Sequence, residues 1–396
     1  MRTYIICVIV CMIAACGMEE VGNAPHVNSD GIWTGVSVSD PYNVCYLTAM
    51  DYPDGYDWRS NPEKGSVKCK LVLYADGIPI LKIPVGESSL VSSDDERHRV
   101  VKGQLYTDYT DGIMTVVKKN GKILYIYDTP ETVDNILVVG GQVHTLCSPL
   151  DGSGFRYRID GKVVVERESA SPYSRMTVYN DTVSFCFSQK TMTGQGMKEN
   201  SYCVKNGKVQ KVELGENISH VWDMMLHHGQ IYMVVTYADG LGPVLVSGQK
   251  KEIVNYFLTQ DMLYCRFVDS ERVSVNARCI YATSNYMTDF LWFENSDWHT
   301  YRIGQPLSAI YVDNESFNAA INPETGDRGL IFKGTKAHNM PEGYFVRGQN
   351  PIARQDSRLI VGLTSRAGGP PLVWTDESID TLDINGYITG LSICKK

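Results

Sequence analysis

The feature that most constrains this chain is a short hairpin signal that recurs along its length. Residues 157–165 (Tyr-Arg-Ile-Asp-Gly-Lys-Val-Val-Val) alternate into an Asp-Gly pair and leave it as a β-branched strand. Asp-Gly and Asn-Gly accept the positive φ angles of a two-residue type I′ turn, so this pattern predicts a tight β-hairpin. The signal recurs at Asp76-Gly77, Asn120-Gly121 and Asn206-Gly207, with degenerate copies around Gly248, Ser296, Gly334 and Asp376.

The near-constant spacing of these eight hairpins predicts a repeat protein. Successive hairpin markers lie 38 to 48 residues apart, and an all-β repeat of roughly 40–50 residues is typical of a β-propeller built from four-stranded blades. No helical 3.6-residue pattern persists after Trp33. We therefore predict an all-β fold, a propeller of eight four-stranded blades, or of seven if one degenerate copy is not a hairpin. A two-domain β-sandwich would need a linker in mid-chain, and none is visible.

The four-strand plan can be followed unit by unit. The third, fifth and sixth units predict strands at 135–139, 142–147, 155–159 and 162–167; at 221–226, 230–237, 242–246 and 250–254; and at 263–268, 273–282, 290–293 and 298–303. The first unit shows only three clear strands, at 44–50, 68–74 and 78–83, whereas the chain ends in an unpartnered strand pattern at 386–393. We expect this C-terminal strand to complete the first blade, which closes the ring and removes an open sheet edge.

The amino terminus has the features of a secretory signal. Arg2 precedes an apolar run from Tyr4 to Ala15, which is too short to span a bilayer permanently. The run ends in Ile-Ala-Ala-Cys-Gly at 13–17, which resembles the lipobox of bacterial lipoproteins. That resemblance implies that 1–15 is a lipoprotein signal peptide and that Cys16 is lipidated, which makes a stable anchor at about 0.8 kcal/mol per buried methylene. A signal peptide without lipidation is the alternative.

The residues after Cys16 suggest where the protein is placed. Residues 16–30 are polar and aperiodic, which predicts a lipidated flexible tether and leaves 31–396 as a single propeller domain. Glu19-Glu20 resembles the surface-export signal of Bacteroidetes-type lipoproteins, and the repeat pattern resembles the propeller lipoproteins common in Bacteroidetes, a likeness of pattern that brings no site residue with it. We expect a lipid-anchored outer-membrane protein, on the cell surface or on the periplasmic face.

Charge argues against a nucleic-acid partner. The net charge is −8 and no run of Lys and Arg occurs, so the basic footprint of nucleic-acid binding is missing.

The sequence motifs of catalytic propellers and of G-x-S-x-G hydrolases are also missing. His227 and His228 are adjacent, so on a strand they would point to opposite faces, and an exposed turn is the better interpretation. His144, His220 and His299 are interpreted as structural, and no cofactor is predicted.

Cysteine usage leaves two alternatives open. Three sequence-near pairs fall on adjacent predicted strands: Cys45/Cys69, Cys186/Cys203 and Cys265/Cys279. An exported chain meets oxidising conditions, so disulfides are allowed, but free cysteines acting as small core residues fit equally well. No close C-x-x-C or Cys/His cluster occurs, so no metal site is predicted.

The loops between the second and third strands of each unit, the B–C loops, are the candidate binding face. In a propeller they emerge together with the D–A loops, opposite the A–B and C–D turns. They are predicted at 51–66, 108–112, 148–154, 189–200, 238–242, 283–288, 322–329 and 365–370. Asp-Gly recurs in them at 54–55, 111–112, 151–152 and 239–240. These pairs either form turns or place a ring of carboxylates at one mouth, suited to a cation or to sugar hydroxyls.

The first of these loops is long and aromatic, and loops on a rigid scaffold are where binding normally resides. Exposed aromatics stack on sugars or anchor proteins, and arginine binds carboxylates in a bidentate manner. The alternative is a loop folded onto its blade, with Trp58 buried. The candidate ligand-binding residues, including three from other loops of this face, are Tyr52, Tyr56, Trp58, Arg59, Tyr286, Arg328 and Arg366.

Together these observations predict a lipid-anchored envelope propeller that binds a glycan or a protein partner without catalysis. A propeller glycoside hydrolase or polysaccharide lyase is the first alternative, because carboxylates from separate blades leave no linear motif. Two carboxylates about 5–9 Å apart in a deep cleft would favour a hydrolase. A scaffold in an envelope complex is the second alternative and predicts a broad apolar patch.

Overall fold

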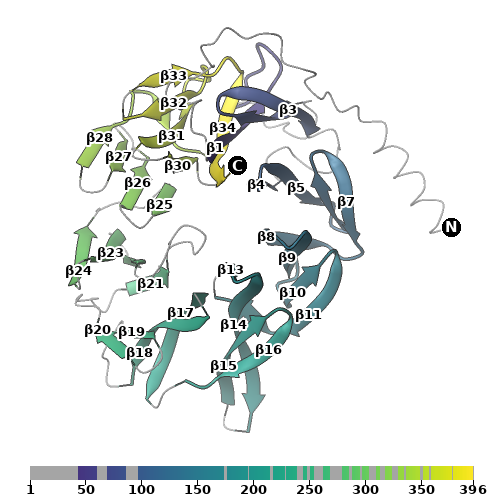
Figure 1. Ribbon diagram of the computed structural model, residues 1–396, viewed down its shortest axis with the longest axis vertical. Coiled ribbons are helices and arrows are strands. Elements are labelled where there is room, and N and C mark those ends of the chain that lie inside the picture. Colours follow the sequence, from purple (N-terminus) through teal and green to yellow (C-terminus); the bar gives the residue numbers. More distant parts are fainter. Residues whose placement is uncertain are drawn as a thin grey trace, which may run out of the picture.

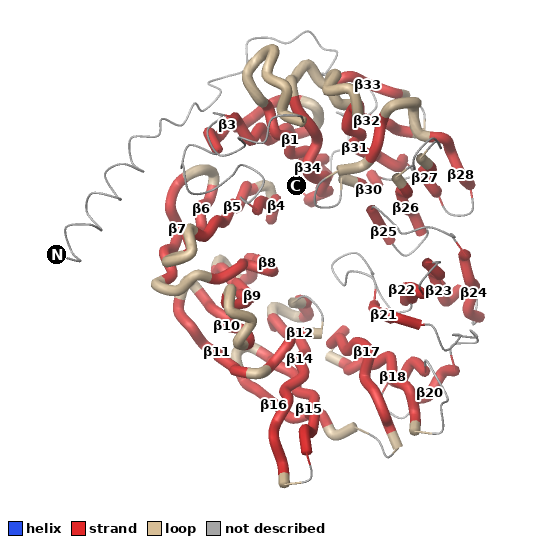
Figure 2. Tube along the Cα trace, turned by 180° about the vertical axis from the view of Figure 1, so that it is seen from behind, coloured by secondary structure: helices blue, strands red, loops and turns tan. Residues whose placement is uncertain are grey.

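The structure is a computed structural model, and all of the strands that it describes lie between Asn43 and Lys395. It describes residues 43–395 except 60–68, 86–96, 174–175, 195, 215–216, 228, 239–243, 248–249, 254–261, 268–278, 285–287, 295–296, 303–308, 313–316, 323–328, 334–335, 348–350, 356–357 and 377. The described residues form 34 strands and no helix (Figure 2). The prediction of an all-β fold is confirmed.

The strands assemble into eight antiparallel sheets among the described residues, numbered here in chain order. Sheet 1 contains β1 (Asn43–Asp51), β2 (Cys69–Ala75), β3 (Ile78–Val85) and β34 (Gly386–Lys395). Sheet 2 contains β4 (Arg97–Val101), β5 (Gln104–Thr110), β6 (Thr115–Lys119) and β7 (Lys122–Tyr127). Sheet 3 contains β8 (Glu131–Val139), β9 (Gln142–Pro149), β10 (Gly154–Ile159) and β11 (Lys162–Glu168). Sheet 4 contains β12 (Ala170–Pro172), β13 (Thr177–Tyr179), β14 (Thr182–Thr193), β15 (Gly196–Lys205) and β16 (Lys208–Val212).

The second half of the chain continues in the same way. Sheet 5 contains β17 (Ile218–His227), β18 (Gln230–Tyr237), β19 (Val244–Ser247) and β20 (Lys250–Ile253). Sheet 6 contains β21 (Met262–Phe267), β22 (Cys279–Ser284), β23 (Thr288–Glu294) and β24 (Asp297–Arg302). Sheet 7 contains β25 (Ala309–Val312), β26 (Phe317–Ile321), β27 (Leu330–Lys333) and β28 (Lys336–Asn339). Sheet 8 contains β29 (Tyr344–Phe345), β30 (Ile352–Gln355), β31 (Arg358–Ser365), β32 (Leu372–Thr375) and β33 (Ile379–Thr381).

The sheets follow one another around a central axis, which is the arrangement of a β-propeller (Figure 1). β4, β8, β17 and β34 lie near the axis, whereas β3, β7, β11 and β16 lie on the outside. The C-terminal strand β34 pairs antiparallel with β1, with Cys394 opposite Val44 and Gly386 opposite Asp51. Sheet 1 is therefore built from both ends of the described chain.

The four predicted Asp-Gly and Asn-Gly hairpin turns have the expected backbone. Asp76, Asn120, Asp160 and Asn206 have φ of 46°, 49°, 48° and 44°, and the glycine after each also has positive φ. Both central residues of a type I′ turn need positive φ, which Asn, Asp and Gly tolerate. The markers Gly248, Ser296 and Gly334 lie outside the described residues.

The Asp or Asn of each turn also bonds to the neighbouring strand. In the first turn the Asp76 N–H donates to the Cys45 carbonyl, and Asp76 Oδ1 accepts from the Cys45 N–H, both at 2.8 Å. The same pair of bonds joins Asn120 to Leu105, Asp160 to Val143 and Asn206 to Val183. We call this two-bond contact the turn clamp. It explains why Asp or Asn, and not a second Gly, precedes the turn glycine.

The hydrophobic core lies between consecutive sheets. One cluster joins Phe155 and Tyr157 of sheet 3 to Phe185 and Phe187 of sheet 4, with the Phe155 and Phe187 ring centroids 4.9 Å apart. Other clusters join sheets 1 and 2, 2 and 3, 4 and 5, 7 and 8, and 8 and 1. Each fully buried side chain of this size contributes about 1.5–3 kcal/mol, so the sheets that these clusters join stabilise one another.

One predicted loop is a pair of strands instead. Residues 189–200 were expected to form a B–C loop, but β14 and β15 stay paired up to Thr193 opposite Gly196. The segment contains the β-branched Thr191 and Thr193, and Gly194 directly follows the end of β14, in open space. These residues favour a two-stranded ribbon over a loop.

The cysteines whose side chains the structure describes are free thiols: Cys45, Cys69, Cys147, Cys186, Cys203 and Cys394. The pairing Cys45/Cys69 is excluded by register, because Tyr46 lies opposite Ala75 and Asp51 opposite Lys70, which puts the two cysteines at opposite ends of their strands. Cys186 lies directly opposite Cys203, and both are buried in the core between sheets 4 and 5. Cys265 lies opposite Ala282 and not opposite Cys279. The structure describes only the backbone of Cys265 and Cys279.

Candidate functional site

The long loop after β1 forms one wall of a pocket of about 580 Å³, which we call the loop pocket. Its other walls come from the turn after β31 and from the segment between β33 and β34, so that it lies at the B–C and D–A end of sheets 1 and 8. The lining residues are Asp51, Asp54, Gly55, Tyr56, Asp57, Trp58, Ala367, Gly368, Pro370, Asp383, Ile384 and Asn385.

Asn385 holds the loop in place from the other end of the chain. Its Nδ2 donates to the carbonyl oxygens of Pro53 at 2.6 Å and Tyr56 at 3.0 Å, and its own carbonyl accepts from the Tyr52 N–H at 2.8 Å. Its N–H donates to Asp51 Oδ1 at 3.3 Å. Asn385 is a site residue that the sequence analysis missed, because nothing local links it to a loop more than 300 positions earlier.

The floor of the loop is a stack of aromatic rings. Tyr52 stacks between Tyr56, at 5.6 Å between ring centroids, and Trp58, at 6.1 Å. Trp58 packs on Tyr387 of β34 at 5.1 Å, and the Arg347 guanidinium lies over both rings. Such ring contacts add about 0.5–1.5 kcal/mol each beyond burial. The loop is therefore a rigid platform.

The structure separates the predicted site residues. The side chains of Tyr52 and Trp58 are 7% and 4% exposed, so the alternative of a loop folded onto its blade holds for these two residues. They support the pocket from below and expose little surface to a ligand. Tyr56 is half-buried and lines the pocket, and Arg59 is exposed beside Gly368.

Of the remaining candidates, only Arg366 lies within the described residues. Arg366 is not among the lining residues, and its guanidinium lies over the Phe345 ring at 6.0 Å. Tyr286 and Arg328 lie outside the described residues. Lipidation of Cys16 also falls outside them.

Four carboxylates line the loop pocket, and none of the lining side chains is cationic. Burial raises the pKa of the Asp51 carboxyl, and the charge of Asp54 adds to the rise, while the Asn385 N–H and two lysines, Lys82 and Lys70, oppose it. The pocket is therefore acidic, and it favours a neutral or cationic ligand over an anion.

The other described Asp-Gly pairs form turns. Asp111 Oδ1 accepts from the N–H groups of Ile113 and Met114, both at 2.9 Å, and Asp151 Oδ1 accepts from the Ser153 N–H at 2.8 Å. The glycine after each has positive φ. These two carboxylates accept hydrogen bonds from the backbone of their own loops, so the turn interpretation holds for Asp111 and Asp151.

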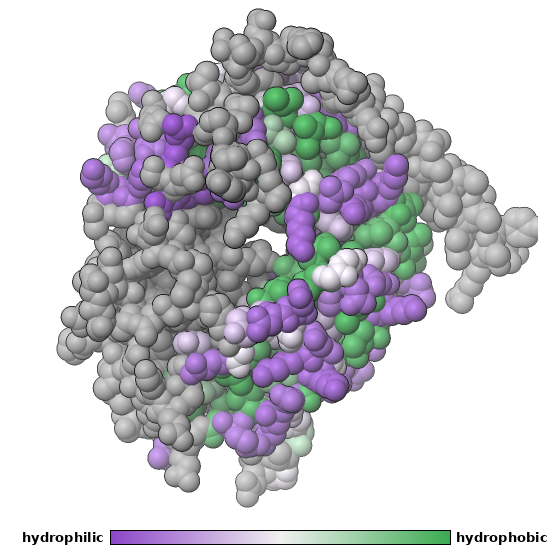
Figure 3. All heavy atoms as spheres, in the orientation of Figure 1, coloured by the Kyte–Doolittle hydropathy of each residue, from purple (hydrophilic) through white to green (hydrophobic). Residues whose placement is uncertain are grey.

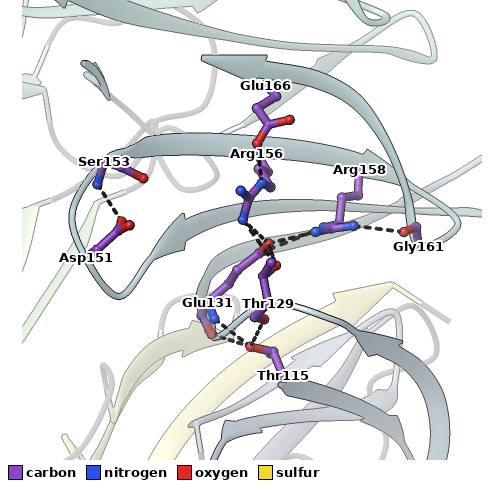
Figure 4. A network of polar contacts seen from close by, with 9 residues as sticks. All are labelled: Thr115, Thr129, Glu131, Asp151, Ser153, Arg156, Arg158, Gly161 and Glu166. Carbon is purple, nitrogen blue, oxygen red and sulfur yellow. Dashed lines mark hydrogen bonds and ion pairs between the residues drawn. The ribbon is translucent and has the colours of Figure 1, made fainter. Parts of the chain in front are cut away.

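A second polar cluster joins sheets 2 and 3 (Figure 4). The Glu131 carboxylate is fully buried and accepts hydrogen bonds from Arg156 Nη1 and Arg158 Nη2, both at 2.7 Å, and from Thr129 at 2.5 Å. The Thr115 hydroxyl accepts from the Glu131 N–H and donates to its carbonyl, at 2.7 and 2.8 Å.

The remaining charges of this cluster are also paired. Arg156 Nε donates to Glu166 at 2.6 Å, and Arg158 lies over the Tyr127 ring at 4.1 Å. Two arginines thus face two glutamates in a satisfied network. We interpret this cluster as structural.

Two further observations limit the chemistry. Within the described ranges, no group of three or more His, Cys, Asp or Glu side chains is placed to hold a metal ion. His144 is buried, and its Nδ1 hydrogen-bonds to the Tyr157 hydroxyl at 2.7 Å, as expected for a structural histidine.

The described part of the chain contains no helix with the length and apolarity needed to cross a membrane.

Comparisons with known proteins support the fold and no activity. No family model matches the chain, and no curated protein does. Among solved structures, the chain is similar to the dihydro-heme d1 dehydrogenase NirN in complex with DHE, with a TM-score of 0.53 and 10% identity over 87% of this chain and 74% of that one. It is also similar to apo AztD from Citrobacter koseri, with a TM-score of 0.46 and 10% identity over 89% and 98% of the two chains. At this identity the likeness concerns the propeller-like fold alone.

Proposed function

We propose that this protein is a lipid-anchored β-propeller of the cell envelope that binds a glycan in the loop pocket without catalysis. The observation that carries the proposal is the combination of a half-buried Tyr56 ring, fixed on an aromatic platform, with four surrounding carboxylates. An aromatic face stacks on the apolar face of a sugar ring, and carboxylates accept hydrogen bonds from its hydroxyls.

The charge of the pocket narrows the class of glycan. With carboxylates from two chain segments, three at 51–57 and one at Asp383, and no lining cation, the pocket repels sulfated sugars and uronic acids. Neutral sugars and amino sugars are the ligands that fit. The same argument weighs against a polysaccharide lyase, whose uronic acid substrate would bring a further negative charge.

Within this proposal the eight sheets are eight blades of one closed ring, and the pairing of β34 with β1 is its closure. Cys16 carries the lipid, residues 16–30 are the tether, and the propeller stands at the outer membrane. Metabolic labelling with an azide-bearing fatty acid tests the anchor. Label should be lost in Cys16→Ala and retained in Cys11→Ala, which changes a cysteine inside the leader.

A glycan array probed with the full chain in detergent tests the ligand. We expect binding to neutral or amino glycans, with an affinity at least tenfold weaker in Tyr56→Ala and in Asp54→Asn. Tyr179→Ala is the matched control, because Tyr179 is an exposed tyrosine of β13 away from the pocket. Binding only to acidic glycans, or equal loss in the control, would contradict the proposal.

A glycoside hydrolase is the second candidate, favoured by Asp51. Its raised pKa beside a second carboxylate, Asp54, is the pattern of a general acid. Release of reducing sugar from a bound glycan, abolished by Asp51→Asn with binding retained, would support the hydrolase over the lectin.

A further inference from the structure

A second pocket lies at the opposite end of the strands, between sheets 1 and 2. It measures about 550 Å³ and we call it the seam groove. Its walls come from the outer strands β3 and β7 and from the turns after β4 and β6, so it opens at the A–B and C–D end, away from the loop pocket. The lining residues are Leu73, Ile80, Leu81, Gly103, Gln104, Lys119, Asn120, Lys122, Ile123 and Leu124.

The floor of the seam groove is apolar and partly open to water. Ile80 of β3 is 41% exposed, and Ile123 and Leu124 of β7 are half-buried. Farther along β7, Ile126 is 40% exposed, and Figure 3 shows apolar surface at the outer side of the ring over this strand. Exposed aliphatic side chains that line a concave site are typical of a docking surface.

The charge of the groove is opposite to that of the protein. The chain carries a net charge of −8, yet the charged residues that line the groove are two lysines, Lys119 and Lys122. No carboxylate among the described residues makes an ion pair with either ammonium group. Lys119 Nζ lies over the Tyr106 ring, 6.0 Å from its centroid. An acidic ligand would therefore meet two cations that have no carboxylate partner among the described residues, beside an apolar floor.

An identical turn elsewhere shows that the turn sequence alone does not make the groove. Residues 119–122 and 205–208 both read Lys-Asn-Gly-Lys, and both are the turn before an outermost strand. At the second turn, Val164 of the preceding sheet packs on Gly207, since a Cβ there would lie 2.4 Å from Val164 Cγ1. The first turn instead faces the 550 Å³ groove.

We propose that the seam groove docks an extended segment of a partner protein in which apolar side chains alternate with carboxylates. In an extended chain, alternate side chains point to opposite sides. Leucine or valine side chains then pack on Ile80, Ile123 and Leu124, while the flanking carboxylates reach Lys119 and Lys122 at the rim. This site is separate from the loop pocket and does not depend on the glycan proposal.

Fluorescence polarisation with a labelled peptide tests the groove. The probe is Asp-Leu-Asp-Val-Asp-Leu-Asp, titrated with the full chain in detergent, and its counterpart carries Lys in place of each Asp. We expect saturable binding of the acidic probe that weakens as salt rises, and none of the basic one. Binding should fall at least tenfold in Lys119→Glu/Lys122→Glu and at least threefold in Ile80→Ala.

The matched control is Lys205→Glu/Lys208→Glu, which makes the same charge change in the identical turn of sheet 4. Binding within twofold of the parent protein is expected for it and for Tyr56→Ala. Equal loss in the two double variants would show non-specific attraction of an acidic peptide and overturn the proposal. Absence of saturable binding by the parent protein would also overturn the proposal, and this holds equally if the cause is that another part of the chain already fills the groove.

Discussion

Glu131 is the residue on which the junction between sheets 2 and 3 depends most. Its buried carboxylate neutralises Arg158, which is 10% exposed, and Arg156, which is 20% exposed. Glu131→Gln keeps the shape but removes the carboxylate partner of Arg158 and leaves Arg156 paired with Glu166 alone, so we expect the free energy of unfolding to fall by about 3–5 kcal/mol. Urea denaturation at pH 7 measures the change. Glu213→Gln, in an exposed pair with Lys211, should change stability by less than about 0.5 kcal/mol, and an equal effect in both variants would contradict the argument.

The same carboxylate makes stability depend on pH. Burial alone raises the pKa of Glu131, but the hydrogen bonds from Arg158, Thr129 and Arg156 outweigh it and hold this pKa below its ordinary value of 4.5. A carboxyl whose pKa is lower in the folded state than in the unfolded state stabilises the fold at pH values above its unfolded pKa. This stabilisation is lost as the pH falls through the folded pKa. The parent protein should therefore lose more stability than Glu131→Gln between pH 6 and pH 3. Parallel urea midpoints for the two proteins over that range would refute this.

The turn clamp lets one hairpin act on two strand pairs at once. In sheet 4, Asn206 combines a φ of 44° with bonds of 2.9 and 3.0 Å to Val183 of the strand beyond its own hairpin. Asn206→Gly keeps the positive φ but removes the side-chain acceptor, which should cost about 1 kcal/mol. Asn206→Ala loses the same acceptor and, unlike glycine, keeps a Cβ at positive φ, which adds about 1–2 kcal/mol relative to the glycine variant. Thermal unfolding should rank the parent above Gly and Gly above Ala; a glycine variant as stable as the parent would show that the clamp contributes nothing.

Features that depend on neighbouring residues could be predicted from the sequence, whereas features that depend on contacts between distant parts of the chain could not. The turn at Asp160-Gly161 could be predicted because positive φ is a property of those two residues. Whether Trp58 is exposed or buried could not be decided from the sequence, because its partners Tyr387 and Arg347 come from the far end of the chain. The sequence indicated the acidity of the loop pocket in part, through Asp54, but Asp383 joins the pocket only because sheet 8 packs against sheet 1.

The meeting of the two chain ends in sheet 1 predicts how the whole molecule loses its structure. β34 buries Ile388 and Leu391 against Leu47 and the neighbouring sheet 8, and it covers the inner edge of β1. Removing residues 386–396 exposes that edge and opens the packing between sheets 8 and 1. An unpaired strand edge is a template for association, so the truncated protein should unfold at a lower temperature and form aggregates.

Adding the missing strand back as a peptide distinguishes the loss of the pairing between β34 and β1 from a general destabilisation by the truncation. A peptide of residues 384–396, added in excess, should bind the truncated protein by strand pairing and raise its melting temperature, as expected for a ligand that binds the folded state alone. The same peptide with Ile388→Asp and Leu391→Asp keeps the backbone but cannot bury its side chains, and should not rescue. Differential scanning fluorimetry and light scattering report both effects. A truncated protein that stays monomeric at the parent melting temperature would show that the pairing of β34 with β1 does not hold the ring closed.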